Sequence, residues 1–165
     1  MANSLFGLLL DRDAAAAWRN EQRASGHRVV FTNGCFDVLH AGHVAYLAWA
    51  REQGDRLVVG LNTDTSVQLL KGKLRPIVPF EGRSVILRAL RSVDVVVPFA
   101  EQTPELLLEI LRPDIHVKSA QYREEDLPER AVVHAYGGVI RLAPHEDGVS
   151  TTDTIARILE RYGSQ

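Results

Sequence analysis

The feature of this sequence that most constrains its fold is a regular alternation between two hydrophobic patterns. Apolar, β-branched residues are concentrated in five short runs: Arg28–Thr32, Arg56–Leu61, Asp94–Pro98, Ile115–Lys118 and Val139–Leu142. The segments between these runs carry apolar residues at intervals of three and four, which is the spacing of a helix with one buried face. Near-continuous apolar strands that alternate with helices indicate a parallel sheet covered on both faces. The sequence therefore predicts a doubly wound α/β fold, a five-stranded parallel sheet with helices on both faces.

The length of 165 residues is that of one ordinary domain. We expect a single domain over residues 1–165, in which residues 1–27 form a helical lead-in and residues 28–165 form the core. Within the lead-in, the alanine-rich stretch from about Leu8 to Ala24 predicts a helix. The main loop is expected from about Lys71 to Gly82, where two prolines oppose regular structure.

The composition excludes several classes of function. Hydrophobic residues make up 45% of the chain, charged residues 24%, and the formal net charge is -2. No basic stripe or tail is present, so general binding to nucleic acid or to an anionic membrane is not expected. The sequence has no apolar run long enough to span a bilayer and no recognisable secretory leader. A single cysteine, Cys35, suits a reducing compartment, and we expect a cytoplasmic protein.

Two histidines, His40 and His43, follow the first predicted strand at the expected start of a helix. Open α/β sheets bind ligands at this kind of corner, where the helix end offers free N–H groups and partial positive charge. Both imidazoles can face a phosphate there, and Gly42 allows a ligand to approach the backbone closely. Two alternatives remain open, namely that the histidines cap or pack against the helix, or that they bind a metal ion.

A second group of cations lies in the expected loop and just after it. Lys71, Lys73 and Arg75 follow the second predicted strand, and Arg83 comes next. Such a run is ordinarily a solvated loop. Its position also allows it to fold over the carboxyl edge of the sheet, where lysines act as point charges and Arg83 grips phosphate oxygens with its planar fork.

A third group precedes the last predicted helix, in the stretch Glu146–Thr152. Ser150 is a natural N-cap, with Asp153 three residues further on, so this stretch is at least a helix start. Hydroxyl groups and free N–H groups at a helix N-terminus also form an anion site.

The donors in these three groups favour one type of reaction. The sequence contains no G-x-G-x-x-G, no G-x-x-x-x-G-K-[ST] and no G-x-S-x-G, and no base is evident beside Cys35. A set of cations and hydroxyl groups without a nucleophile suits a reaction whose nucleophile is already ionised. A phosphate monoester attacking a nucleoside triphosphate fits, because its second pKa is about 6. Catalysis would then depend on positioning and electrostatic stabilisation.

Phe31–His43 together with Gly148–Thr152 resembles the cytidylyltransferase-like nucleotidyltransferases. The chain is more similar still to the adenylyltransferase half of the bifunctional bacterial heptose kinase/adenylyltransferases. That similarity includes Gly54–Asn62, Arg75–Pro79, Val97–Phe99, Arg112–Asp114 and Tyr136–Gly138.

The resemblance implies a Rossmann-like nucleotidyltransferase fold and transfer of AMP from ATP to a sugar 1-phosphate. Heptose 1-phosphate is the expected acceptor, ADP-sugar and pyrophosphate are the products, and Mg²⁺ is carried by the triphosphate without dedicated protein ligands. A homodimer is implied, acting alone or beside a separate sugar kinase. The alternatives are a cytidylyltransferase or flavin adenylyltransferase with another small phosphorylated acceptor, such as glycerol 3-phosphate, and a non-catalytic nucleotide-binding module.

The resemblance also implies roles for individual residues. Catalysis falls to His40, His43, Lys73 and Arg83. Nucleotide binding falls to Asn33, Gly34, Cys35, Phe36, His40, His43, Lys73, Asp147, Gly148, Ser150 and Thr151. Acceptor binding falls to Lys71, Lys118, Gln121 and Tyr122.

One departure from the heptose pattern concerns the acceptor. The fourth strand of those enzymes usually ends in Val-Lys-Gly-Gly-Asp-Tyr, whereas Val117–Tyr122 reads Val-Lys-Ser-Ala-Gln-Tyr. Two glycines and a carboxylate are replaced where a sugar or nucleobase could approach. Lys118 and Tyr122 align with the Lys and Tyr of the heptose pattern. We therefore expect this departure to affect the choice of acceptor.

Overall fold

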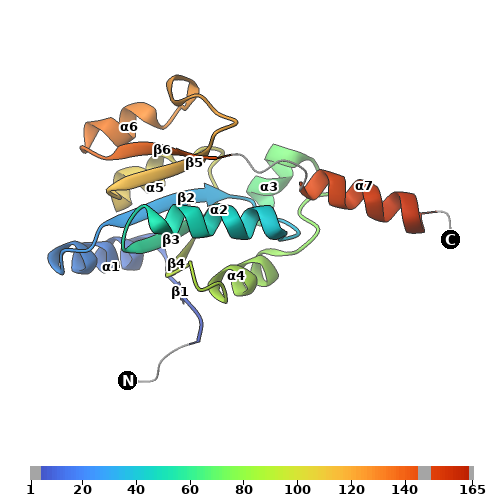
Figure 1. Cartoon of the computed structure of the whole chain (residues 1–165), viewed down its shortest axis with the longest axis horizontal. Coiled ribbons are helices and arrows are strands. Elements are labelled where there is room, and N and C mark those ends of the chain that lie inside the picture. The colour runs from blue at the N-terminus through green and yellow to red at the C-terminus, as the bar shows by residue number, and fades with distance from the viewer. Residues whose placement is uncertain (1–4, 145–149, 164–165) are drawn as a thin grey trace.

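The computed structural model describes residues 5–144 and 150–163, and a parallel sheet lies between two layers of helices in it (Figure 1). The strands are β1 (Leu8–Leu9), β2 (Val29–Gly34), β3 (Arg56–Asn62), β4 (Val95–Phe99), β5 (Ile115–Ser119) and β6 (Val139–Ala143). The α-helices are α1 (Arg12–Ala24), α2 (Ala41–Glu52), α3 (Asp64–Lys71), α4 (Phe80–Arg88), α5 (Glu105–Leu111), α6 (Arg130–Ala135) and α7 (Thr151–Tyr162). A 3₁₀ turn, η1 (Glu124–Asp126), precedes α6.

The predicted doubly wound α/β architecture is confirmed, with one more strand than expected. Each of the five predicted runs forms a strand, and all the pairings are parallel. The sixth strand, β1, pairs with β4 through Leu8 and Leu9. These two leucines were expected inside the first helix, which instead begins at Arg12. Asp11 caps that helix, because its side chain accepts a hydrogen bond from the backbone N–H of Ala14. A strand of two residues is too short to show a period in the sequence.

The two faces of the sheet pack on different helices because successive strand residues point to opposite sides. On one face, Val30, Val59 and Val96 pack with Leu47 of α2 and Leu87 of α4. On the other face, the apolar cluster joins the sheet to α1, α5 and α6 through Val29, Phe31, Val58, Val95, Val97, Ala15, Leu107, Leu108, Leu111 and Val133. Both faces are therefore buried, which explains the near-continuous apolar strands.

The strand order β1-β4-β3-β2-β5-β6 creates a switch point between β2 and β5. From β2 the chain adds β3 and β4 on one side, and then crosses back to place β5 and β6 on the other side. Phe31 of β2 is in register with His116 of β5. Open α/β sheets bind ligands in the crevice outside the carboxyl ends of the strands at such a point.

The expected loop is shorter than predicted. Helix α3 ends at Lys71, Gly72 follows with a φ of 96°, and α4 already begins at Phe80. The positive φ explains why a glycine occupies this helix end. None of the helices within the described ranges has the length and apolar content to cross a membrane.

Candidate active site

The crevice at the switch point holds a cavity of about 680 Å³. Its walls come from the ends of β2 and β5, the start of α2, the end of α3 and the start of α7. The predicted site residues that line this cavity are Asn33, Gly34, Cys35, Phe36, His40, His43, Lys71, Lys118, Gln121, Tyr122, Ser150 and Thr151. Members of all three donor groups, which are separated in the sequence, thus converge on one cavity.

The two histidines form a stacked pair at the start of α2. Their ring centroids are 3.8 Å apart, and the His43 ring also meets the edge of Phe36 at 5.4 Å. His40 is the N-cap residue of α2, yet its side chain makes no capping hydrogen bond. The Nδ1 atoms of both rings are buried without a hydrogen-bond partner among the described residues. Buried polar atoms in proteins are normally paired, so these two Nδ1 atoms are an exception within the described part of the chain.

The electrostatic setting keeps both imidazoles neutral near pH 7. Burial lowers the pKa of His43 to about 4, and the neighbouring His40 adds to this effect. Burial also lowers the pKa of His40. Each ring therefore offers a single N–H donor in the free protein.

The start of α7 forms another wall of the cavity. Ser150 caps this helix by accepting a hydrogen bond from the N–H of Asp153 at 3.0 Å, as predicted. The hydroxyl of Thr151 donates to the backbone oxygen of Asp37 at 2.7 Å, which fastens the helix to the loop before α2. Two helix N-termini consequently border one cavity, and each contributes partial positive charge. Asp147 and Gly148, which were expected here, lie outside the described residues.

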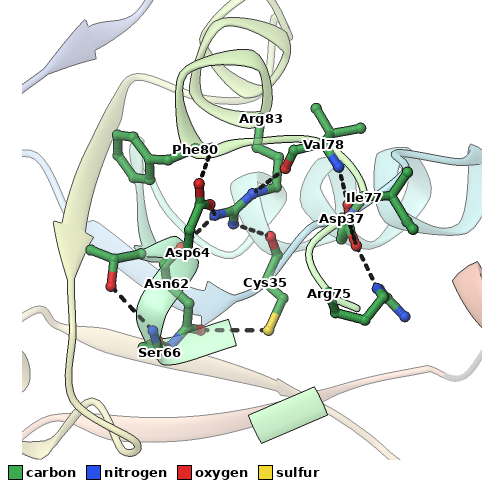
Figure 2. Close-up of polar contacts among 11 residues, drawn as sticks. Cys35, Asp37, Asn62, Asp64, Ser66, Arg75, Ile77, Val78, Phe80 and Arg83 are labelled. Carbon is green, nitrogen blue, oxygen red and sulfur yellow. Dashed lines mark hydrogen bonds and ion pairs between the residues drawn. The ribbon is translucent and has the colours of Figure 1, made fainter. Parts of the chain in front are cut away.

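Asp37 anchors the loop that leads into the histidines (Figure 2). Its carboxylate is buried and accepts hydrogen bonds from Arg75 Nε at 2.5 Å and from the backbone N–H groups of Ile77 and Val78 at 2.8 and 2.9 Å. Burial alone would raise the pKa of Asp37, but these three bonds outweigh it and hold the pKa below its ordinary value.

The loop around Asp37 is also strained. Phe36 and Val38, its two neighbours, have φ values of 45° and 49°. Non-glycine residues rarely adopt this left-handed region, because it costs free energy that the surroundings must supply. The three bonds to Asp37 hold the chain between these two residues, shortly before His40.

Arg83 lies beneath the site and does not reach the cavity. Its side chain is fully buried, and its guanidinium donates to the backbone oxygens of Val78, Cys35 and Asn62 and to the carboxylate of Asp64 at 2.7 Å (Figure 2). The expectation that Arg83 grips phosphate oxygens is therefore not met by this geometry. The residue instead ties the ends of β2 and β3 to the segment before α4.

The two lysines of the second group lie differently. Lys71, at the end of α3, lines the cavity. Lys73 is exposed on the following segment and is not among the lining residues. Arg75, whose role was open, lines the cavity while paired with Asp37.

Lys118 of β5 lies across the switch point from β2. Its ammonium group donates to the side-chain oxygen of Asn33 at 3.3 Å and lies 5.3 Å from the ring centre of Tyr122. Asn33 is the penultimate residue of β2 and Lys118 is the penultimate residue of β5, so the pair marks the two sides of the crevice. Gln121 also lines the cavity.

Cys35 is half-buried, and its Sγ atom is 4.0 Å from the side-chain oxygen of Asn62. Burial raises the pKa of the Cys35 thiol despite the nearby Lys71, Arg83 and Arg75. A protonated thiol is a poor nucleophile, which favours a binding role through the backbone.

Two aromatic residues of the cavity were missed from the sequence. Tyr46 and Trp49 line it from α2, and they follow His43 at intervals of three. The Tyr46 hydroxyl donates to the backbone oxygen of Val117 and bonds to Thr32, which joins α2 to β2 and β5. The spacing after His43 was the available signal, since residues three and four apart share a helix face.

Metal-binding side chains are not clustered in the part of the chain that the structure describes. No three His, Cys, Asp or Glu side chains there are grouped as ligands for an ion. Asp37, the one acidic residue among the described residues that line the cavity, already accepts three hydrogen bonds.

Comparisons with known proteins agree with this geometry. The chain is 49% identical over 152 residues to the bifunctional protein HldE of Pelobacter propionicus, covering 92% of this chain and 31% of that protein. It is 53% identical over 139 residues to bifunctional protein HldE of Aeromonas hydrophila, covering 84% of this chain and 29% of the relative. The chain thus spans about a third of the length of these curated relatives.

Solved structures share the fold. A lipopolysaccharide core biosynthesis protein from Thermoplasma volcanium matches with a TM-score of 0.61 and 25% identity, covering 75% of this chain and 100% of that one. Pantoate-beta-alanine ligase from Francisella tularensis matches with a TM-score of 0.60 and 14% identity, covering 96% and 80%. The family model described as cytidylyltransferase-like matches residues 31–157, which include both histidines and the start of α7. The chain therefore belongs to the cytidylyltransferase-like family.

Proposed function

We propose that this chain is a nucleotidyltransferase that moves AMP from ATP to a sugar 1-phosphate, with heptose 1-phosphate as the acceptor. The observation that carries the proposal is the convergence of two helix N-termini and a stacked histidine pair on one cavity. This set of donors suits the oxygens of a polyphosphate. The similarity to HldE proteins supports the heptose acceptor.

The reaction needs no base from the protein. An oxygen of the acceptor phosphate, already ionised near pH 7, forms a bond to the α-phosphorus of ATP while the bond from that phosphorus to the bridging oxygen breaks. Pyrophosphate leaves with the electron pair. His40 and His43 donate hydrogen bonds to the oxygens on which charge accumulates, and the N–H groups at the start of α7 hold the far end of the triphosphate.

The remaining residues bind rather than react. Asn33, Gly34, Cys35 and Phe36 contact the nucleotide, Lys71 and Lys118 hold the acceptor phosphate, and Gln121 and Tyr122 border the sugar. Lys73 serves the triphosphate from the exposed segment after α3. Arg83 supports the site from below as a positioning residue.

Mg²⁺ would be bound by the triphosphate and would need no ligand from a protein side chain. The Asp37 carboxylate is occupied by Arg75 and two N–H groups, so phosphate oxygens supply the ligands. When bound, the ion neutralises charge on those oxygens. We also propose a homodimer, which light scattering can check.

The test is a pyrophosphate-release assay of ATP and CTP against heptose 1-phosphate, other sugar 1-phosphates, glycerol 3-phosphate and flavin mononucleotide. We expect turnover with ATP and heptose 1-phosphate. Turnover with CTP alone would refute the proposal. Binding of ATP in a calorimeter without pyrophosphate from any acceptor would instead identify a non-catalytic nucleotide-binding module.

A further inference from the structure

Glu129 is a buried carboxylate outside the recognised motifs. It contacts Lys118, which lines the cavity. Glu129 is only 1% exposed, and it occupies the N-cap position of α6 without capping that helix. The residues that usually cap a helix through their side chains are Ser, Thr, Asp and Asn, so this role is not expected of a glutamate. The side chain of Glu129 points to the sheet instead, and its burial there calls for an explanation.

The partners of Glu129 are two residues of β5. One carboxylate oxygen lies 3.0 Å from Nε2 of His116 and 3.2 Å from Nζ of Lys118. His116 is completely buried, and burial lowers its pKa, so the ring is neutral and donates its Nε2 proton. Although burial opposes ionisation, hydrogen bonding to His116 and the charge of Lys118 lower the pKa of Glu129 to about 2. The arrangement is an ionised carboxylate that holds a lysine from within the fold.

Lys118 is thereby held at a defined place. The ammonium group is bound by Glu129 on the inner side and by Asn33 across the switch point, and its side chain is 14% exposed. A free lysine has many rotamers, and fixing them on binding costs free energy. A lysine that is already fixed in the free protein avoids that cost when an anion binds.

We propose that Glu129 is a positioning residue for the acceptor, which holds the Lys118 ammonium at the crevice so that it meets the acceptor phosphate. This inference rests on the proposed function for the identity of the anion. It assigns a role to α6, which carries no part of the family motifs described above. The ion pair is mostly buried, so solvent screens its attraction less than in a surface pair, and removal of one partner would leave the other charge uncompensated.

The kinetic test is a double-mutant cycle with Glu129→Gln and Lys118→Ala. Glutamine keeps the volume and an accepting oxygen but removes the charge. We expect Glu129→Gln to raise the KM of the sugar 1-phosphate about tenfold and to change the KM of ATP less than twofold. In the Lys118→Ala background, the same substitution should change the acceptor KM less than twofold, because the carboxylate acts through the lysine.

Two results would overturn the inference. One is an equal rise in the KM values of both substrates, and the other is an effect of Glu129→Gln that persists undiminished without Lys118. Glu125→Gln is the matched control, since Glu125 is exposed and pairs with Arg123 on the surface. If Glu129→Gln does not fold, Glu129→Asp replaces it in the same test. Aspartate keeps the negative charge but is one methylene shorter, so its carboxylate lies further from the Lys118 ammonium.

A chemical measurement separates this inference from the proposed function. Acetylation of Lys118 by an amine-specific reagent, followed by mass spectrometry of the free protein, needs no substrate. We expect Glu129→Gln to speed the modification of Lys118 several-fold and to leave exposed Lys73 unchanged. If Glu129→Gln speeds the labelling of Lys118 while the wild-type protein turns over no sugar 1-phosphate, the proposed function is refuted and the positioning of Lys118 is still supported. Unchanged labelling would refute the positioning itself.

Discussion

Replacing Asp37 with Asn would test whether one buried carboxylate holds the loop that precedes the two histidines. The carboxylate accepts three hydrogen bonds, one of them from the guanidinium of Arg75. An amide has one accepting oxygen and one donating nitrogen, so at least one of these donors would face another donor. A buried donor without an acceptor costs about 1–3 kcal/mol, and a hydrogen bond to a charged group contributes about 1.5–3 kcal/mol.

We therefore expect Asp37→Asn to lower the free energy of unfolding by about 3 kcal/mol, measured by urea denaturation at pH 7. The turnover number should fall as well, because the strained backbone at Phe36 and Val38 loses its support. Asp55→Asn is the matched control. Asp55 is exposed and accepts a hydrogen bond from the N–H of Arg28, so this variant should keep the denaturation midpoint of the wild type.

The pH dependence gives an independent check on Asp37. Because its pKa in the folded protein lies below the ordinary value of 3.8, the ionised carboxylate contributes stability above that value. This contribution is lost as the pH falls through the lowered pKa. The difference in stability between wild type and Asp37→Asn should thus be full at neutral pH and shrink below about pH 4. A variant as stable as the wild type at pH 7 would refute the reasoning.

Two further residues give sharp expectations. His43→Ala should lower the turnover number by about 10²-fold with little change in the unfolding midpoint, as for loss of one preorganised donor to the transition state; an unchanged rate would leave His43 a packing residue. In the free protein, NMR titration should place the His43 pKa near 4, and a bound triphosphate should raise it, because an anion favours the charged imidazole. Arg83→Lys should cost about 3 kcal/mol of stability, since one ammonium cannot replace the bonds to Asp64 and three backbone oxygens. A stable but inactive Arg83→Lys would instead support direct contact with phosphate.

The strands and their parallel arrangement were predictable because both faces of the sheet are buried. Burial on both faces leaves a run of apolar residues that stands out from the helical spacing around it. Strand β1 escaped prediction, since Leu8 and Leu9 contact β4 without any period of their own. Its pairing depends on the neighbouring strand and is not visible locally.

The candidate site was predictable where it consists of polar donors at helix starts. His40, His43 and Ser150 have this character, and they line the cavity. Arg83 shows the limit of such predictions, because a guanidinium can donate either to phosphate oxygens or to carbonyl oxygens. Only the tertiary structure distinguishes the two partners. The same holds for Glu129, whose bond to His116 joins residues that no local pattern connects.

Helix α7 projects away from the sheet, and none of its described residues is buried (Figure 1). Its first turn nevertheless forms one wall of the cavity and is fastened through Thr151 to the loop before α2. Segments with few buried contacts open at a free energy far below that of global unfolding. The amide protons of α7 should consequently exchange with solvent long before those of β2 and β3. Occupation of the cavity by a polyphosphate would then slow exchange in this helix first, so that binding is coupled to the local stability of a segment that the hydrophobic core does not protect.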